Sequence, residues 1–241
     1  MEYFFRRFYI KSTGVLRVME EDRVMSHSTL KSIISHYLSK IFPDISQQEA
    51  DFMSDVAVED FINYVSVQNN FLYDNDFSIK TLNYITFLAK EDPFKMDKIL
   101  SEWLEVWILK WKQRVKLVMS DDPESTKSIK TLEDKVSPLV NNLGEDLVYF
   151  KKFAIGSLVM QGEVCFTNLM ADMVVKEVLF KVASSQNTDE ALKFVRANPL
   201  FIINELVKRV KEVSRFKGNL VVVRINPAFF QETRGDVVEW W

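Results

Sequence analysis

The chain has little of the chemistry that catalytic and metal sites require: its 241 residues include one cysteine and two histidines. A single thiol excludes an internal disulfide, and Cys165 lies among apolar neighbours, a setting typical of an inert buried cysteine. His27 and His36 are nine residues apart, so they do not share a helical face or form a zinc pattern. Glycine-rich phosphate loops and a GxSxG motif are also absent. The sequence therefore predicts no catalytic residues, no metal ligands and no cofactor.

Glycine and proline are scarce, with six of each, whereas the chain holds 19 phenylalanines. Few helix breakers and many large apolar side chains predict long helices around a thick core. No run approaches the roughly 18 apolar residues of a membrane-spanning helix, so we predict no transmembrane segment. The net charge of −3 gives the whole chain no attraction to nucleic acid or anionic membranes. We expect a soluble, intracellular protein of the cytoplasm, which the single cysteine also fits.

The central helix of the protein is predicted over residues 92–119, DPFKMDKILSEWLEVWILKWKQRVKLVM. Asp92 can cap its first amides, and Pro93 suits the first helical position, where no donor is needed. Tryptophans follow at intervals of four residues, along one face: Trp103, Trp107 and Trp111. They could serve as stacking platforms for nucleic-acid bases. We favour a buried core face, because the same face also carries Leu100, Leu104 and Ile108.

Breakers and capping residues divide the second half of the chain. The apolar pattern of residues 145–183 is too long for one ordinary globular helix, so we expect a break or kink near Gly156 or Gly162. Asn187, followed three residues later by glutamate, can cap the next helix. Pro199 separates the two last helices.

Strand signals occur only at the two ends of the chain. Residues 3–10 and 15–19 predict a β-hairpin around a Ser-Thr-Gly turn, and residues 220–225 and 237–241 predict two further strands. Because an isolated hairpin is weak, we expect the two ends to share one sheet. The sequence therefore predicts an α+β fold, predominantly α-helical. In it, a multi-helix body packs on a small antiparallel sheet formed from the N-terminal hairpin and the C-terminal strands.

We interpret the whole chain, residues 1–241, as a single domain. The best internal break is the polar loop at residues 120–126, where an Asp-Pro pair ends one helical pattern and begins the next. The helices on both sides of this loop need partners for their apolar faces, which favours a loop within one domain over a linker. The loop is the candidate sub-boundary.

Two helix ends carry basic clusters that suggest a surface for nucleic acid or an acidic partner. One lies at the end of the tryptophan helix, and the other precedes the C-terminal strands. Together they comprise Lys110, Lys112, Arg114, Lys116, Lys208, Arg209, Lys211, Arg215 and Lys217. The competing interpretation is a pair of solvated helix ends whose charge matches the helix dipole. Convergence of the two clusters in space would favour the binding interpretation.

Acidic residues concentrate in residues 44–92, which hold ten carboxylates and only two lysines. This polarity could orient the chain on a partner of complementary charge, but we favour a solvated acidic face. The Asp-Asn-Asp triplet at residues 74–76 begins like a calcium loop and lacks the glycine and closing glutamate of that motif. Residues 133–135 have the acid-x-lysine form of some nucleases, within a helical pattern. A metal-dependent enzyme is therefore only a third hypothesis.

The sequence ends in two tryptophans, Trp240 and Trp241, which form a candidate protein interface because large apolar side chains seldom remain in water without a reason. Missing catalytic machinery and abundant aromatic residues favour a non-enzymatic interaction or structural subunit of a larger protein or nucleoprotein assembly. We expect another protein or further copies of the chain as the partner. Nucleic acid bound at the basic helix ends is the alternative.

Overall fold

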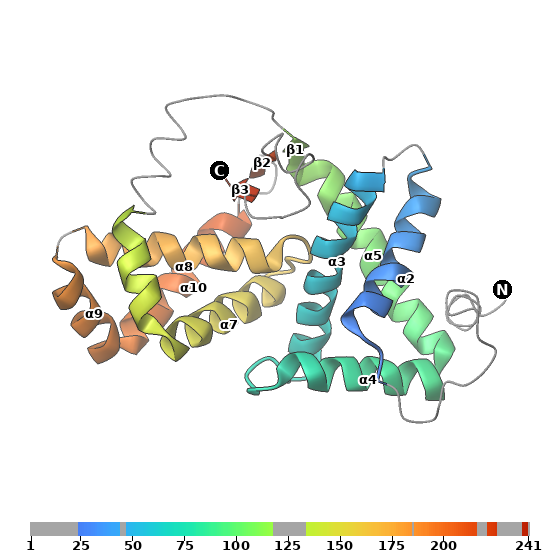
Figure 1. Cartoon of the computed structure of the whole chain (residues 1–241), viewed down its shortest axis with the longest axis horizontal. Helices are drawn as coiled ribbons and strands as arrows, with labels where there is room; N and C mark the ends of the chain where they lie inside the picture. The colour runs from blue at the N-terminus through green and yellow to red at the C-terminus, as the bar shows by residue number, and fades with distance from the viewer. Residues whose placement is uncertain are drawn as a thin grey trace. The chain divides into compact units, whose positions relative to one another are not determined.

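Helices dominate the structure. A computed structural model of the chain describes residues 24–43, 47–117, 134–184, 186–215, 221–225 and 238–240. Nine helices account for almost all of these described residues, and Figure 1 shows them in chain order from blue to red. The chain divides into two units, Met1–Lys110 and Trp111–Trp241.

Unit 1 is built from helices that pack around α3. Its described helices are α2 (His27–Ile41), α3 (Gln47–Gln68), α4 (Phe77–Glu91) and most of α5 (Pro93–Arg114). α2 and α4 both pack on α3, and α4 runs crosswise to α3 in Figure 1. Asp92 separates α4 from α5, and its Oδ1 accepts a hydrogen bond from the amide of Lys95 at 3.0 Å. The helix cap predicted at Asp92 is therefore confirmed.

The core of unit 1 forms where the apolar faces of these helices meet. α2 contributes residues at three- and four-residue spacing, all fully buried: Leu30, Ile33, Ile34 and Leu38. Phe61 of α3 and Leu100 of α5 are also fully buried. This spacing is what an amphipathic helix needs to present one continuous apolar stripe. Removal of that stripe from water is the main stabilising contribution to unit 1.

Unit 2 is centred on α8. Its described helices are a helix at residues 134–143, α7 (Glu145–Met160), α8 (Thr167–Ala183), α9 (Thr188–Ala197) and α10 (Pro199–Arg215). α8 packs on α7, α9 and α10. It buries Val174, Val175, Val178 and Val182. Because β-branched residues are mediocre helix formers, burial among neighbouring helices stabilises α8 more than local propensity does.

The long apolar pattern of residues 145–183 is broken between α7 and α8, at the second of the two predicted positions. Gly162 has φ +82°, a left-handed conformation that glycine adopts without steric cost. Phe166 precedes α8 with φ 58°, which is unfavourable for a bulky residue. Its ring is buried, with its centroid 4.6 Å from that of Trp111. This packing offsets the backbone strain at Phe166.

The last two helices begin where the sequence indicates. Oδ1 of Asn187 accepts a hydrogen bond from the amide of Glu190 at 2.9 Å, which confirms the predicted cap of α9. Pro199 is the first residue of α10, a position where its missing N–H costs nothing. α10 packs on α7 and α8. It fully buries three residues that are four apart: Ile202, Leu206 and Val210.

The predicted α+β class is wrong, because the described chain is almost entirely helical. The strands within the described residues are three short segments: β1 (Val115–Leu117), β2 (Val221–Ile225) and β3 (Val238–Trp240). β2 pairs in parallel with β1 and antiparallel with β3. The third element of this pairing thus comes from the middle of the chain, and the pairing is not purely antiparallel. The predicted N-terminal hairpin lies outside the described residues.

α5 ends at Arg114, before the predicted end of the tryptophan helix at Met119. The residues that follow alternate between apolar and basic, and over so short a span this pattern fits either a helix or a strand. Pairing of Val115–Leu117 with β2 selects the strand. The helix was predicted too long because the local pattern holds no information about a pairing partner about a hundred residues away.

α5 contributes to both units, because the boundary between Lys110 and Trp111 falls inside it. The sub-boundary predicted at residues 120–126 lies outside the described residues. That the two units behave as the single domain expected from the sequence stays a prediction. None of the helices in the described ranges combines the length and the apolar character that crossing a bilayer requires.

Candidate functional site

The three tryptophans of α5 are core residues. Trp103, Trp107 and Trp111 are 4%, 0% and 8% exposed, respectively. The ring of Trp103 also packs on Phe61 of α3, with 5.0 Å between the ring centroids. Base stacking requires an accessible ring face, which these buried indoles do not offer. The interpretation of the tryptophan ladder as a core face is therefore confirmed.

Two of these indoles differ in how their N–H groups are satisfied. Nε1 of Trp107 donates a hydrogen bond to Oδ2 of Asp60 at 2.9 Å, and Asp60 is itself fully buried. Nε1 of Trp103 is buried without an acceptor among the described residues. Because a buried carboxylate is costly unless it is hydrogen-bonded, the bond from Trp107 fixes Asp60 of α3 against α5. We interpret this pair as structural.

The first basic cluster has one side chain within the described part. Lys110 is half-buried near the end of α5. The side chains of the other members of this cluster, Lys112, Arg114 and Lys116, lie outside the described residues, as do those of Arg215 and Lys217 in the second cluster. Convergence of the two clusters therefore stays a hypothesis.

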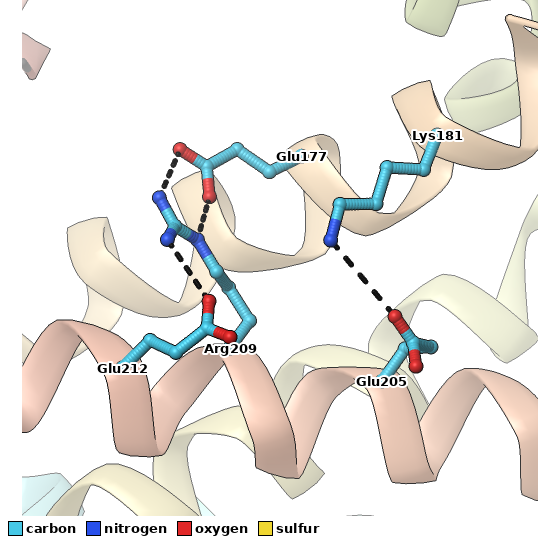
Figure 2. Close-up of polar contacts among 5 residues, drawn as sticks. All are labelled: Glu177, Lys181, Glu205, Arg209 and Glu212. Carbon is cyan, nitrogen blue, oxygen red and sulfur yellow. Dashed lines mark hydrogen bonds and ion pairs between the residues drawn. The ribbon is translucent and has the colours of Figure 1, made fainter.

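Arg209, in the second basic cluster, is held by carboxylates. Figure 2 shows its guanidinium on α10 facing Glu177 of α8, with Nε–Oε2 and Nη2–Oε1 distances of 2.5 and 3.2 Å. Glu212 accepts a third hydrogen bond from Nη1 at 3.2 Å. The hydrogen bonds to Glu177 raise the pKa of Arg209 above its usual value. Lys208 and Lys211 are exposed on the same helix. The structure thus assigns Arg209 to joining α8 and α10.

Replacement of Arg209 tests this assignment. We expect Arg209→Met, which keeps the aliphatic stem, to lower the free energy of unfolding by about 1–2 kcal/mol, since it removes a bidentate, partly buried ion pair. Lys208→Met is the matched control at an exposed position and should change stability by less than about 0.5 kcal/mol. Urea denaturation followed by circular dichroism measures both. Equal stabilities of the two variants would refute the bridging role.

The acidic stretch is partly neutralised within unit 1. Nζ of Lys80 lies 3.0 Å from Oδ2 of Asp74 and 3.4 Å from Oδ1 of Asp76, so a lysine faces the calcium-like triplet. The hydrogen bond to Asp74 is the main reason that the pKa of Lys80 is raised. On α3, Oε1 of Glu59 lies 2.6 Å from Nε2 of His27. These exposed contacts, two lysine ion pairs and one histidine hydrogen bond, fit the interpretation of a solvated acidic face.

The remaining candidates from the sequence do not assemble into a site within the described residues. No group of three or more histidine, cysteine, aspartate or glutamate side chains in this part of the chain could hold a metal ion. Cys165 is fully buried, as predicted. The backbone of Trp240 belongs to β3, but its side chain and Trp241 lie outside the described residues. The interface proposed for the two tryptophans stays a prediction.

An exposed apolar surface in unit 2 was missed by sequence reasoning. Leu200 and Phe201, in the first turn of α10, are 74% and 47% exposed. Val148 and Tyr149, near the start of α7, are half-exposed. We call these four residues the α7/α10 corner. Exposed apolar residues are ordinary when scattered, but two large pairs at the starts of two packed helices suggest a contact surface.

Arg196, at the end of α9 and just before α10, contacts residues at the start of α7. Its Nη2 donates a hydrogen bond to the carbonyl oxygen of Asn142 at 2.8 Å. Its Nε lies 3.7 Å from Oδ2 of Asp146 in the first turn of α7. Because Arg196 lies just before α10, these contacts place the starts of α7 and α10 on the same side of unit 2. The four members of the α7/α10 corner thus belong to two helices whose first turns lie on the same side of unit 2.

A sequence signal for this surface exists. The buried face of α10 repeats every four residues from Ile202. At about 100° per residue, Phe201 lies about 100° before Ile202, and Leu200 lies about 40° beyond Ser214, the last buried residue of that series, so both fall outside the face. Large apolar residues out of phase with the buried stripe, directly after a helix-starting proline, are therefore expected to be exposed.

Comparison with known proteins does not identify the chain further. No family model, no curated protein and no solved structure matches it. The surfaces of the two units are therefore the basis for inferring function.

Proposed function

We propose that this protein is a non-enzymatic interaction subunit that binds an apolar surface of another protein, or of a further copy of itself, through the α7/α10 corner. The observations that support this proposal are the exposure of Leu200 and Phe201 in the first turn of α10, and that of Val148 and Tyr149 near the start of α7. The contacts of Arg196 bring these two helix starts to the same side of unit 2. Covering apolar surface contributes about 25 cal/mol per Å² removed from water, so such a patch favours association. Tyr149 and Phe201 are also of the aromatic type that is enriched in the centres of interfaces.

Nucleic-acid binding is the less favoured alternative. Lys208 and Lys211 are exposed on α10, but Arg209 between them already bonds two carboxylates. A phosphate group would have to compete with Glu177 and Glu212 for that guanidinium. Repulsion between those carboxylates and an approaching phosphate further disfavours this surface.

Leu200→Asp tests the proposed interface. We expect the wild-type chain to appear in size-exclusion chromatography with light scattering above the mass of one chain, as a homo-oligomer or with a protein partner at fixed ratio. Leu200→Asp should weaken the association by about tenfold or more, because it places a charge in the apolar contact. Stability should be unchanged or higher by about 0.3–1 kcal/mol, because an acid in the first turn of α10 favours the helix dipole.

Ile79→Asp is the matched control. Ile79 is 60% exposed and also lies in the first turn of a helix, α4 of unit 1, so the chemical change is the same. It should leave the association intact. A wild-type monomer without a stoichiometric partner would contradict the proposal, as would equal weakening by both variants. Nucleic acid in the wild-type peak, detected by the ratio of absorbance at 260 and 280 nm, would instead favour the alternative.

A further inference from the structure

The first two turns of α7 carry an acid at one end and a base at the other. Glu145 is exposed and Lys152 is half-buried. Between them lie Val148 and Tyr149, which are 52% and 48% exposed. Each charged residue is three positions from one member of this apolar pair and four from the other, so all four lie on one side of the helix. We call these four residues the α7 face. Along the helix it is acidic, then apolar, then basic.

The charges on the two flanks of the α7 face are balanced within the chain. Asp146 and Lys151 lie on opposite flanks, about 100° around the helix from the nearest members of the face. Oδ2 of Asp146 lies 3.7 Å from Nε of Arg196, and Lys151 forms an ion pair with Asp172 of α8. The charge pattern of the face is therefore set by its own two ends.

The exposed side of α10 repeats the order of apolar residues followed by basic ones. α8 runs antiparallel to both α7 and α10, given its short connection to α7 and its ion pairs with α10 (Figure 2), so α7 and α10 are parallel. Leu200 and Phe201 are exposed in the first turn of α10, and Lys208 and Lys211 are exposed about two and three turns later. The carboxylates of α10, by contrast, contact basic side chains of unit 2.

A face with this order of charges is complementary to itself when a second copy is turned end to end. Consider two antiparallel α7 helices related by a twofold axis that passes between Val148 and Tyr149. In this register Glu145 lies opposite Lys152 of the second copy, and Val148 lies opposite Tyr149 of the second copy. The symmetry produces each of these contacts twice, as in other twofold interfaces. A parallel arrangement would instead place like charges opposite each other.

We propose that the chain forms a twofold-symmetric dimer through antiparallel α7 helices, with Leu200 and Phe201 of each copy adding to the apolar contact. This inference rests on the proposed function of the α7/α10 corner and names a second copy as its occupant. Covering the apolar residues supplies most of the affinity, whereas the charged pairs at the rim fix the orientation of the two copies. Because the contact is small, the dimer is reversible.

Charge reversal at the two ends of the α7 face tests this pairing. We expect sedimentation equilibrium of the wild-type chain to show a reversible monomer–dimer equilibrium. Glu145→Lys and Lys152→Glu should each weaken the dimer by about tenfold, because each replaces two attractive pairs with two repulsive ones. The variant that carries both changes should regain near wild-type association, and so should an equimolar mixture of the two single variants. Lys98→Glu, at an exposed lysine of unit 1, is the control and should have no effect.

The outcomes separate this inference from the proposed function. A dimer that Leu200→Asp weakens but that the double charge reversal does not restore would refute the antiparallel α7 pairing and leave the corner as the interface. A wild-type chain that is monomeric and binds a different protein at fixed ratio would also overturn the dimer alone. A monomer without any partner would overturn both. Circular dichroism of every variant checks that the helices remain folded.

Discussion

Trp107→Phe is expected to lower the free energy of unfolding by about 2–4 kcal/mol, although it exchanges one aromatic residue for another. Trp107 is fully buried, so the smaller ring leaves a cavity in unit 1. The same change removes the 2.9 Å hydrogen bond from Nε1 to Oδ2 of Asp60. Since Asp60 is fully buried, its carboxylate then loses a donor that water does not readily replace. Guanidinium denaturation followed by far-ultraviolet circular dichroism measures the loss without relying on tryptophan fluorescence.

Trp103→Phe is the matched control, four residues earlier on the same helix. It deletes the same atoms from a position that is 4% exposed. The Nε1–H of Trp103, however, is buried and has no acceptor within the described part of the chain. The change to phenylalanine therefore also removes an unsatisfied donor. We expect a cost of about 1 kcal/mol or less, because relief of that donor offsets part of the cavity term. Equal costs at both positions would mean that the bond to Asp60 contributes nothing measurable.

Phe166→Ala is expected to be the most damaging change in unit 2, with a loss of about 3–5 kcal/mol. The Phe166 ring is buried and lies against Trp111, with 4.6 Å between the centroids. Truncation removes this packing and leaves alanine in the left-handed conformation that precedes α8. Phe201→Ala is the control for loss of an exposed phenylalanine. It should cost at most about 1.5 kcal/mol, chiefly the edge contact with Phe194.

Glycine at the same position separates packing from backbone strain. Glycine is normally less favourable than alanine, but at φ 58° it has no Cβ to clash. We therefore expect Phe166→Gly to be more stable than Phe166→Ala by about 1 kcal/mol, the inverse of the usual order. Denaturation of the two variants under identical conditions measures the difference. Alanine as the more stable variant would show that the turn before α8 relaxes once the ring is gone.

Much of the helical architecture follows from the sequence because it depends on local interactions. Asp92 and Asn187 cap helices where their side chains lie three residues before a free amide. Gly162 breaks the long pattern because it adopts a positive φ that other residues resist. The burial of Trp107 could also be predicted, since its apolar face is wider than a stacking strip. Each of these inferences needs only the chemistry of one helical turn or two.

The pairing of the strands could not be predicted in the same way. Val115–Leu117 continues an apolar and basic alternation from the end of α5, and only its pairing with Val221–Ile225 makes it a strand. Strand pairing is a contact between segments distant in sequence, so no local pattern specifies it. The prediction of a shared terminal sheet assumed that the two ends of the chain must pair with each other. β2 instead pairs in parallel with β1, which comes from the middle of the chain.

For the candidate sites, too, some properties follow from the sequence and others only from the tertiary structure. Composition alone determined that the chain forms no disulfide within itself and that basic residues gather at two helix ends. Only the tertiary structure shows which of the described side chains already have partners. From the sequence, Arg209 could bind a partner, but in the structure Glu177 of α8 lies opposite its guanidinium. Leu200 became a candidate contact because it lies outside the buried face of α10. The physical reason is that helix formation and net charge depend on near neighbours, whereas availability of a side chain depends on what packs against it from elsewhere in the chain.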